Sequence, residues 1–348
     1  MQKINSMKGN MKILISDASL RDGNHAIGHQ ITEQQIARYC KAVELAGVPI
    51  VEVGHGNGLG ASSLQVGEAL LDDITMLTTA RKYLTKSKLG IHVIPGFATI
   101  ENDLINAIKC GVDVFRIASH CTEADITESH IRFCRMEGKT VFGVLMMSHM
   151  ANKEILSDEA NKMQDYGAEA VILMDSSGNY LPKDVEEKVS FLVNNLKIAV
   201  GFHGHNNLGM AIANSITAIE NGATIIDGCS RGFGAGAGNT QLEALVAVLE
   251  RMGYDLGIDL YKILDASEIA EKEIMNQVPT IGSASIISGL SGVFSGYLKP
   301  VNRIAKEYKI DPRDLFFELG QRKVVAGQED LIVEVASELS KNANFNEK

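Results

Sequence analysis

Two short segments of this 348-residue sequence carry side chains that could together hold a metal ion, namely HGH (203–205) and RDGNH (21–25). The histidines of the first segment end an apolar run typical of a β-strand, in which residues i and i+2 point to the same side. We expect Asp22 to complete a set with His203 and His205. Two imidazoles and one carboxylate leave about three octahedral positions for substrate and water, which suits Mn²⁺, Mg²⁺ or a related divalent ion.

The ligand set alone does not fix the reaction. Non-haem Fe(II) oxygenases use the same two histidines and one carboxylate. Those enzymes usually carry the set on a double-stranded β-helix, whereas this sequence alternates β with α patterns. In a purely structural interpretation, Asp22 pairs with Arg21 at the surface, and the histidines are ordinary core or loop residues. The two segments considered together favour the metal site.

A glycine-rich segment, GFGAGAGN (232–239), loosely resembles a dinucleotide-binding loop. Such a loop follows the first strand of its fold, and an acidic residue ends the second strand about twenty residues later. Here the segment follows the last apolar run, and no such acidic residue comes after it. We interpret it as a tight turn, with Asn239 or Thr240 as the N-cap of the next helix.

Short β-branched runs alternate with amphipathic segments along most of the chain, and this order predicts a parallel sheet covered by helices. Eight runs are expected to be strands: residues 12–16, 49–54, 89–95, 113–119, 140–146, 170–175, 198–205 and 224–230. Helical patterns lie between them, for example at 32–47, 101–111 and 208–222, and most end in glycine as at a helix C-cap. Eight βα units in about 250 residues predict an α/β fold, the (β/α)8 TIM barrel, whose active sites lie in the loops after the strands.

From about residue 260 the helical patterns follow one another without strands, which predicts an all-helical C-terminal subdomain packed on the barrel. The predicted divisions are an N-terminal extension (1–11), the barrel (12–259), the helical subdomain (260–341) and a tail (342–348). The uncharged stretch 281–298 is half Gly or Ser, so we expect a helix with a small-residue face rather than a membrane span.

Composition narrows the class of protein. The hydrophobic content of 45% excludes a disordered chain, and a formal charge of -10 without long like-charged runs argues against nucleic acid or an anionic membrane as partner. The first residues lack an apolar segment with a cleavage site, so we expect a cytoplasmic protein. Five cysteines, far apart and without a CxxC motif, are typical of reduced and mostly buried thiols.

The motifs considered together resemble the 4-hydroxy-2-oxovalerate aldolases. That family belongs to the DRE-TIM metallolyase superfamily, together with isopropylmalate synthase and hydroxymethylglutaryl-CoA lyase. The matching segments run from the first strand to the last helices: LRDGNHAIGHQ (20–30), VEVGHGNGLGASS (51–63), FRIASHCTEAD (115–125), LMDSSG (173–178), HGHNNLG (203–209), GFGAGAGNTQLE (232–243) and GQEDLIVEVA (327–336).

The resemblance implies a lyase that cleaves a 4-hydroxy-2-oxoacid, 4-hydroxy-2-oxopentanoate, to pyruvate and acetaldehyde in a retro-aldol reaction. It also implies a divalent ion, usually Mn²⁺, with Mg²⁺ or Co²⁺ as alternatives. In the family this ion is bound by the Asp of the RDG loop and by both His of HxH. In this chain those residues are Asp22, His203 and His205.

Further roles follow from the same resemblance and its chemistry. Arg21 is expected to stabilise the developing enolate oxygen as a fixed cation. His25 is expected to be the general base on the C4 hydroxyl, because an imidazole titrates near the working pH. Ser176 is the expected further hydrogen-bond donor, and we also expect His203 and Phe294 to contact the substrate.

Two positions depart from the family pattern. Relatives typically carry Tyr in a GVYSSF-like segment, where its hydroxyl helps to place the aldehyde end of the substrate, whereas here GVFSGY (292–297) has Phe294. Tyr297 is the alternative source of a hydroxyl. Asn57 stands where relatives often have Asp. Both changes fit either a related aldolase with a different aldehyde, for example in biosynthesis, or neutral drift within the same activity.

The resemblance also implies a partner. The family works as a complex with an acylating acetaldehyde dehydrogenase, docked through the C-terminal helices, so an oligomer is expected. The stretch 281–298 fits close packing either against that partner or within the chain. The runner-up activity is that of an acyl-CoA Claisen-type condensing enzyme or lyase of the same superfamily. The loop HGNGLGASS (55–63) and the segment GQED (327–330) favour the aldolase, and a merely scaffolding subunit would have lost the metal residues.

Overall fold

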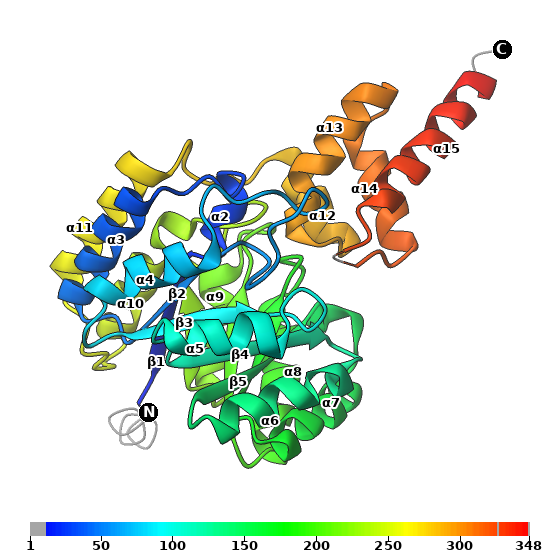
Figure 1. Cartoon of the computed structure of the whole chain (residues 1–348). Coiled ribbons are helices and arrows are strands. Elements are labelled where there is room, and N and C mark those ends of the chain that lie inside the picture. The colour runs from blue at the N-terminus through cyan, green and yellow to red at the C-terminus, as the bar shows by residue number, and fades with distance from the viewer. Residues whose placement is uncertain (1–11, 326, 347–348) are drawn as a thin grey trace.

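Eight parallel strands close into a barrel, in which each strand pairs with the next one along the chain and β8 pairs with β1 (Figure 1). The computed structural model describes residues 12–325 and 327–346. The strands are β1 (Leu14–Leu20), β2 (Ile50–Val53), β3 (Lys88–Val93), β4 (Val114–His120), β5 (Thr140–Met146), β6 (Ala170–Asp175), β7 (Ala199–Gly204) and β8 (Ile225–Gly228). The predicted (β/α)8 barrel is confirmed. The predicted N-terminal extension and residues 347–348 of the predicted tail lie outside the described residues.

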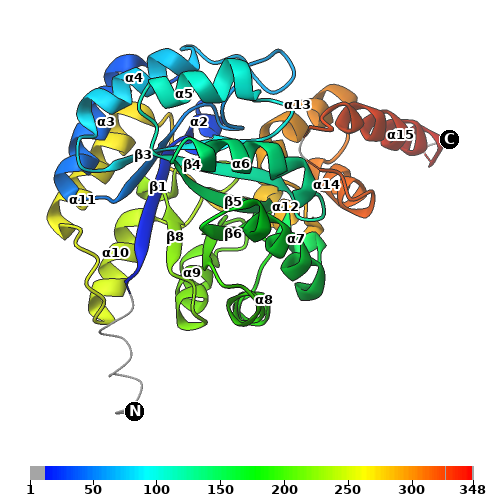
Figure 2. The same ribbon diagram turned by 60° about the horizontal axis from the view of Figure 1, so that its bottom comes forward.

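Helices surround the barrel, and a separate group of helices follows it (Figures 1 and 2). The helices of the barrel are α2 (Gly23–Ala26), α3 (Glu33–Ala46), α4 (Asp73–Tyr83), α5 (Ile105–Lys109), α6 (Glu128–Met136), α7 (Lys153–Tyr166), α8 (Pro182–Asn195), α9 (Ala211–Glu220), α10 (Leu242–Arg251) and α11 (Leu260–Ile269). The C-terminal helices are α12 (Ser283–Ser291), α13 (Leu298–Tyr308), α14 (Pro312–Gln321) and α15 (Asp330–Asn346).

Helix α3 illustrates how local sequence fixes the elements around the barrel. At its start the Thr32 hydroxyl accepts a hydrogen bond from the Gln35 amide, and the Gln35 side chain accepts one from the Thr32 amide, which together form a capping box. At its end Gly47 adopts φ 82°, a left-handed conformation that glycine takes without steric cost. Between them Ile36 and Val43 are buried against the sheet.

Strand β1 is longer than predicted. The predicted strand covers residues 12–16, whereas β1 continues past Asp17 and Ser19. Both side chains are buried outside the barrel, where the Asp17 carboxylate accepts hydrogen bonds from the Ser19 amide (2.9 Å) and the Tyr39 hydroxyl (2.7 Å). Because Tyr39 of α3 and Ser19 of the strand itself satisfy this buried carboxylate, the strand continues to Leu20 and the loop begins only at Arg21.

The prediction for the start of α10 was wrong. Its N-cap is Gln241, and neither Asn239 nor Thr240 caps it. The reason is tertiary, since Asn239 forms an isolated β-bridge with His205. The glycine-rich segment therefore returns to the barrel edge before the helix begins at Leu242.

The inside of the barrel changes from apolar to charged along the strands. Inward-facing positions nearer the strand starts are apolar, including Ile50, Val114, Phe142, Ala170, Ile172 and Ile225. Two residues further along, the same faces of β2, β4 and β8 carry Glu52, Arg116 and Asp227, all of them buried. The interior therefore has an apolar floor beneath a charged layer.

The C-terminal helices form a second core of their own. Val301, Leu315, Phe316 and Val335 are among its fully buried side chains. Helices α12 and α14 pack closely at Gly320, where a Cβ atom would lie only 2.3 Å from the Ser291 carbonyl oxygen. In Figures 1 and 2 this group stands to one side of the barrel, and α15 projects away from it.

The two cores divide later in the chain than the predicted boundary after residue 259. Ile263, Ala266 and Ile274 belong to the core of the barrel, and the second core includes residues from Ala284 onward. The predicted domain boundaries stay predictions. The described helices include none with the length and hydropathy of a membrane span. All five cysteines are free thiols, and four of them are buried, as expected.

The Arg116–Asp227 ion pair permits a test of the charged layer. Arg116→Met is expected to lower the free energy of unfolding by about 3–5 kcal/mol, because it leaves buried carboxylates without their counter-charge. The measurement is urea denaturation. The matched control is Arg132→Met, which removes an exposed pair with Glu128 and should cost less than about 1 kcal/mol. Equal costs for the two variants would contradict the buried-charge interpretation.

Candidate active site

The three predicted metal ligands meet at the mouth of the barrel. One ligand atom from each of Asp22, His203 and His205 lies within 4.8 Å of the others. His203 Nε2 is 3.7 Å from one Asp22 oxygen, and His205 Nε2 is 3.8 Å from the other. All three side chains are buried, and neither Nε2 atom has a hydrogen-bond partner among the described residues. Buried, unpaired nitrogens converging on a carboxylate are what a bound cation would satisfy.

The other ring nitrogen of each histidine fixes its orientation. His203 Nδ1 is 2.8 Å from the Asp227 carboxylate, and His205 Nδ1 is 2.9 Å from the Asp175 carbonyl oxygen. Both acceptors require a proton on Nδ1, so each Nε2 presents its lone pair to the site. Burial also lowers the pKa of His203 and keeps its imidazole in the neutral form that binds metals.

A line of buried charges connects Asp22 to His203 through the barrel interior. Arg21 donates to Asp22 (2.6 Å) and to Glu52 (3.1 Å). Glu52 lies 3.6 Å from Arg116, whose two terminal nitrogens donate to both oxygens of Asp227. The Asp227 carboxylate in turn accepts from His203. Arg21 therefore positions Asp22 directly, and Arg116 positions His203 through Asp227.

The pKa values of the carboxyl groups follow from these pairs. Burial disfavours the charged form of Asp22, but the charge of Arg21 holds its pKa well below the usual range. Burial also disfavours the charged form of Asp227, but the charge of Arg116 and the hydrogen bond from His203 lower its pKa. Both groups are therefore carboxylates at neutral pH, the state in which Asp22 can ligate a cation.

Sequence reasoning missed four residues of this layer, namely Glu52, His92, Arg116 and Asp227. Each stands inside an otherwise apolar strand, in VEV, IHV, FRI and IID. That position was the available signal, because a charged side chain in a buried strand is rarely tolerated without a partner. Their partners come from strands distant in sequence, so the pattern alone does not identify what they bind.

His25 lies on the short helix α2 and lines the same pocket. Its ring contacts the edge of Phe294, with the centroids 6.2 Å apart, and His29, with the centroids 5.2 Å apart. Burial lowers the pKa of His25 to about 4. An imidazole that titrates near neutral pH was expected. The buried His25 is instead a weaker base, which carries a free lone pair throughout the neutral range.

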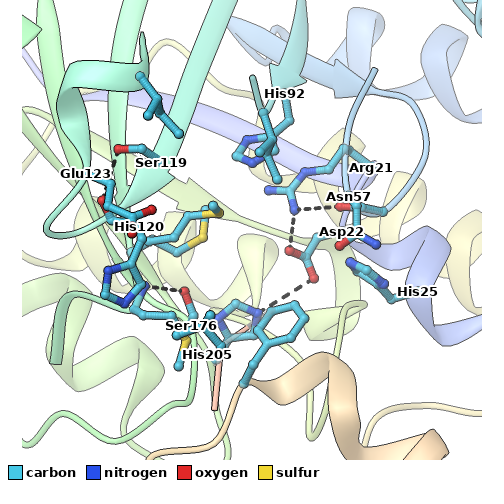
Figure 3. A pocket seen from close by; sticks show the side chains of 18 residues that line it. Arg21, Asp22, His25, Asn57, His92, Ser119, His120, Glu123, Ser176 and His205 are labelled. Atoms are coloured by element: carbon cyan, nitrogen blue, oxygen red, sulfur yellow. Dashed lines mark hydrogen bonds and ion pairs between the residues drawn. The ribbon is translucent and has the colours of Figure 1, made fainter. Parts of the chain in front are cut away.

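Ser176 lines the pocket after β6 (Figure 3). Its hydroxyl oxygen accepts a hydrogen bond from the Met147 amide at 2.9 Å, which leaves its proton free to donate. The Ser176 carbonyl accepts from the Ser295 amide (2.9 Å), and the Asn207 amide group donates to the Ser295 hydroxyl. These contacts attach the segment that carries Phe294 to the barrel mouth.

Phe294 lines the pocket, but Tyr297 does not replace the missing hydroxyl. The Tyr297 hydroxyl donates to the Val325 carbonyl (2.6 Å) and accepts from the Gln328 amide (3.1 Å). It is therefore occupied inside the C-terminal core. The wall near Phe294 has no phenolic donor from this segment.

The pocket has a volume of about 170 Å³, smaller than the roughly 300–1,000 Å³ of drug-sized sites, so it suits a small substrate (Figure 3). Three of its lining residues, His25, Asn57 and Phe294, also line a larger cleft of about 870 Å³ between the barrel mouth and the C-terminal helices. The site therefore opens toward the C-terminal helices.

Comparison with known families identifies two regions of the chain. The HMGL-like family matches residues 12–270, which include the barrel and α11. The DmpG-like communication domain matches residues 279–341, which include most of the C-terminal helices.

Curated relatives match nearly the whole chain. A 4-hydroxy-2-oxovalerate aldolase from Pectobacterium atrosepticum is 62% identical, covering 97% of this chain and 98% of its own length. A protein of the same name from Spirochaeta aurantia is 64% identical, covering 95% and 97%. The carboxyl transferase domain of Rhizobium etli pyruvate carboxylase superposes with a TM-score of 0.80 at 15% identity, over 97% of this chain and 62% of that one. This last similarity concerns the fold alone.

The contact between His203 and Asp227 leads to a prediction about metal affinity. Asp227→Asn should weaken Mn²⁺ binding by about 10–100-fold, because the amide no longer holds the imidazole with a full negative charge. Isothermal titration calorimetry of metal-free protein measures the change. The matched control is Asp113→Asn at the opposite end of the barrel, where the carboxylate pairs with Arg81. If both variants bind Mn²⁺ like the unmodified protein, Asp227 has no part in positioning the ligand.

Proposed function

Because the chain belongs to the HMGL-like family and, within it, to the 4-hydroxy-2-oxovalerate aldolases, we propose that it cleaves 4-hydroxy-2-oxopentanoate to pyruvate and acetaldehyde in a metal-dependent retro-aldol reaction. The observation that carries this proposal is the convergence of two unpaired imidazole nitrogens and one carboxylate beside Arg21 and His25. The pocket also has the small size that a five-carbon substrate requires.

Asp22, His203 and His205 are the proposed ligands of a divalent ion, with Mn²⁺ as the proposed metal. Bound there, such an ion would supply a Lewis acid for the 2-oxo group of the substrate. The ligand set leaves about three octahedral positions free, and one carboxylate with two imidazoles suits this borderline class of ion.

Arg21 and His25 are the proposed catalytic side chains. His25 takes the proton of the C4 hydroxyl, the C3–C4 bond breaks, and C4 becomes the carbonyl carbon of acetaldehyde. The electron pair of the broken bond forms the enolate of pyruvate, which becomes pyruvate when C3 takes up a proton. Arg21 Nη2 is buried without a hydrogen-bond partner among the described residues, and this donor is available to the enolate oxygen.

Ser176 and Phe294 are proposed to contact the two halves of the substrate. The free Ser176 proton suits an acceptor oxygen on the oxoacid half. Phe294, beside His25, offers an apolar surface to the methyl group of the aldehyde half.

The C-terminal helices are proposed to bind an acylating acetaldehyde dehydrogenase, so that the two proteins form an oligomer. The proposed location of the protein is the cytoplasm. The match to a DmpG-like communication domain over residues 279–341 supports this partner. Helix α12 leaves apolar side chains exposed, with Ile286 39% and Leu290 57% exposed, and a partner surface would cover them.

Metal dependence is the first test of the proposed reaction. Metal-free protein given Mn²⁺ and 4-hydroxy-2-oxopentanoate should release pyruvate, and EDTA should abolish the release. Pyruvate is followed with lactate dehydrogenase and NADH. Release that persists in EDTA would refute the metal mechanism, and no release under any condition would refute the substrate.

Variants separate the metal ligands from the base. His203→Ala should lose both Mn²⁺ and activity, because it removes one of the three ligands. His25→Ala should keep its metal but lower kcat by about 10²–10⁴-fold, the usual contribution of a general base. Metal content by atomic absorption accompanies each rate. Equal metal content and equal activity in the two variants would contradict both assignments.

The pKa of His25 predicts an unusual acid limit. The proposed base acts in its neutral form, so activity is lost as pH falls through the pKa, which burial lowers to about 4. As the pH falls below about 6.5, the ordinary pKa of an imidazole, the kcat/KM of metal-loaded protein should therefore stay nearly constant. Metal content is measured at each pH, so that loss of the ion is recognised. A decline centred near pH 6.5 with the metal still bound would contradict the prediction.

A further inference from the structure

His92 presents an unused hydrogen-bonding atom to the pocket. Its side chain on β3 is 2% exposed and lines the pocket, near Arg21 in Figure 3. Nδ1 is buried without a hydrogen-bond partner among the described residues and lies 3.8 Å from Glu52 Oε1. Because the side chain lines the pocket and Nδ1 is directed to Glu52, we infer that Nε2 is the ring nitrogen that a ligand can reach.

The surroundings of His92 define what Nε2 can do. The Glu52 carboxylate, itself paired with Arg21 and Arg116, can only accept hydrogen bonds, so the favoured tautomer carries the proton on Nδ1. Burial, with the positive charges of Arg21 and Arg116, holds the pKa of His92 well below its ordinary value and keeps the ring neutral. Nε2 is thus an acceptor, and it requires a donor from the ligand.

A substrate with a single hydroxyl offers only one hydrogen-bond donor to the acceptors of this pocket. 4-Hydroxy-2-oxopentanoate carries one donor at neutral pH, its C4 hydroxyl, and the proposed mechanism assigns that proton to His25. An acceptor that remains buried without a donor costs free energy. At another wall of the pocket His120 and Glu123 add further polar atoms (Figure 3).

We propose that His92 is a specificity-determining residue that accepts a hydrogen bond from a second hydroxyl on the aldehyde half of the substrate. The preferred substrate class is then a 4,5-dihydroxy-2-oxoacid, which is cleaved to pyruvate and a 2-hydroxyaldehyde. The bond that breaks is still C3–C4, and the proton and the electron pair move as in the reaction above. This inference rests on the proposed retro-aldol function and refines its substrate.

The test compares two aldehydes of equal size, since glycolaldehyde differs from propionaldehyde only by a hydroxyl in place of a methyl group. Each is condensed with pyruvate by the Mn²⁺-loaded full-length protein, and kcat/KM is measured for each aldehyde. The unmodified protein should prefer glycolaldehyde by about fivefold or more, the value of one neutral hydrogen bond. His92→Leu should abolish or reverse this preference.

Two further variants identify the atom responsible. His92→Gln places an acceptor oxygen near the position of Nε2 and should retain part of the preference. His130→Gln is the matched control, because His130 is a buried histidine outside the pocket that bonds to the Ala98 carbonyl, and it should leave the preference unchanged. Thermal melting and Mn²⁺ content establish that each variant is folded and loaded.

The outcomes separate this inference from the function on which it rests. Condensation with propionaldehyde or acetaldehyde, but no preference for glycolaldehyde in the unmodified protein, overturns the role of His92 alone. The same holds if His92→Leu changes kcat/KM for both aldehydes by the same factor. If the unmodified protein forms no product with pyruvate and any of the three aldehydes, the proposed aldolase function itself fails.

Discussion

A line of alternating charges buried inside the barrel is the interaction on which the site depends. It runs from one proposed metal ligand to another through four strands and a loop, in the order Asp22, Arg21, Glu52, Arg116, Asp227, His203. Removing these groups from water is costly, and the cost is offset only because every charge has a counter-charge within a few ångströms. The barrel closes around this layer, so the position of each member is constrained by its neighbours on other strands.

This arrangement explains why the site suits a cation. The line contains three carboxylates and two guanidinium groups, which leaves one net negative charge in a low-dielectric interior. A divalent ion at Asp22 would reverse the sign of that charge and would satisfy the two imidazole nitrogens that have no partner among the described residues. Asp22 and Asp227, next to the arginines, remain ionised at neutral pH, so Asp22 stays ready to bind the metal.

The second constraint comes from the C-terminal helices. The segment before α13 supplies Phe294 to the pocket, and it is attached to the barrel through Ser176, Asn207 and Ser295. A wall of the catalytic pocket is therefore contributed by the part of the chain that resembles a communication domain. A partner bound to those helices would reach the wall of the pocket through this segment.

The sequence by itself determined the eight βα units, the (β/α)8 fold, the approximate strand positions and the segments that carry Asp22, His203 and His205. These features depend on local periodicity and on residues close together in the chain. Only the tertiary structure decided that β1 continues through Asp17 and Ser19, that Gln241 caps α10, and that Tyr297 is occupied elsewhere. It also brought Glu52, His92, Arg116 and Asp227 into one layer. Their partners lie on distant strands, and pairing across a closed barrel leaves no signal in local sequence.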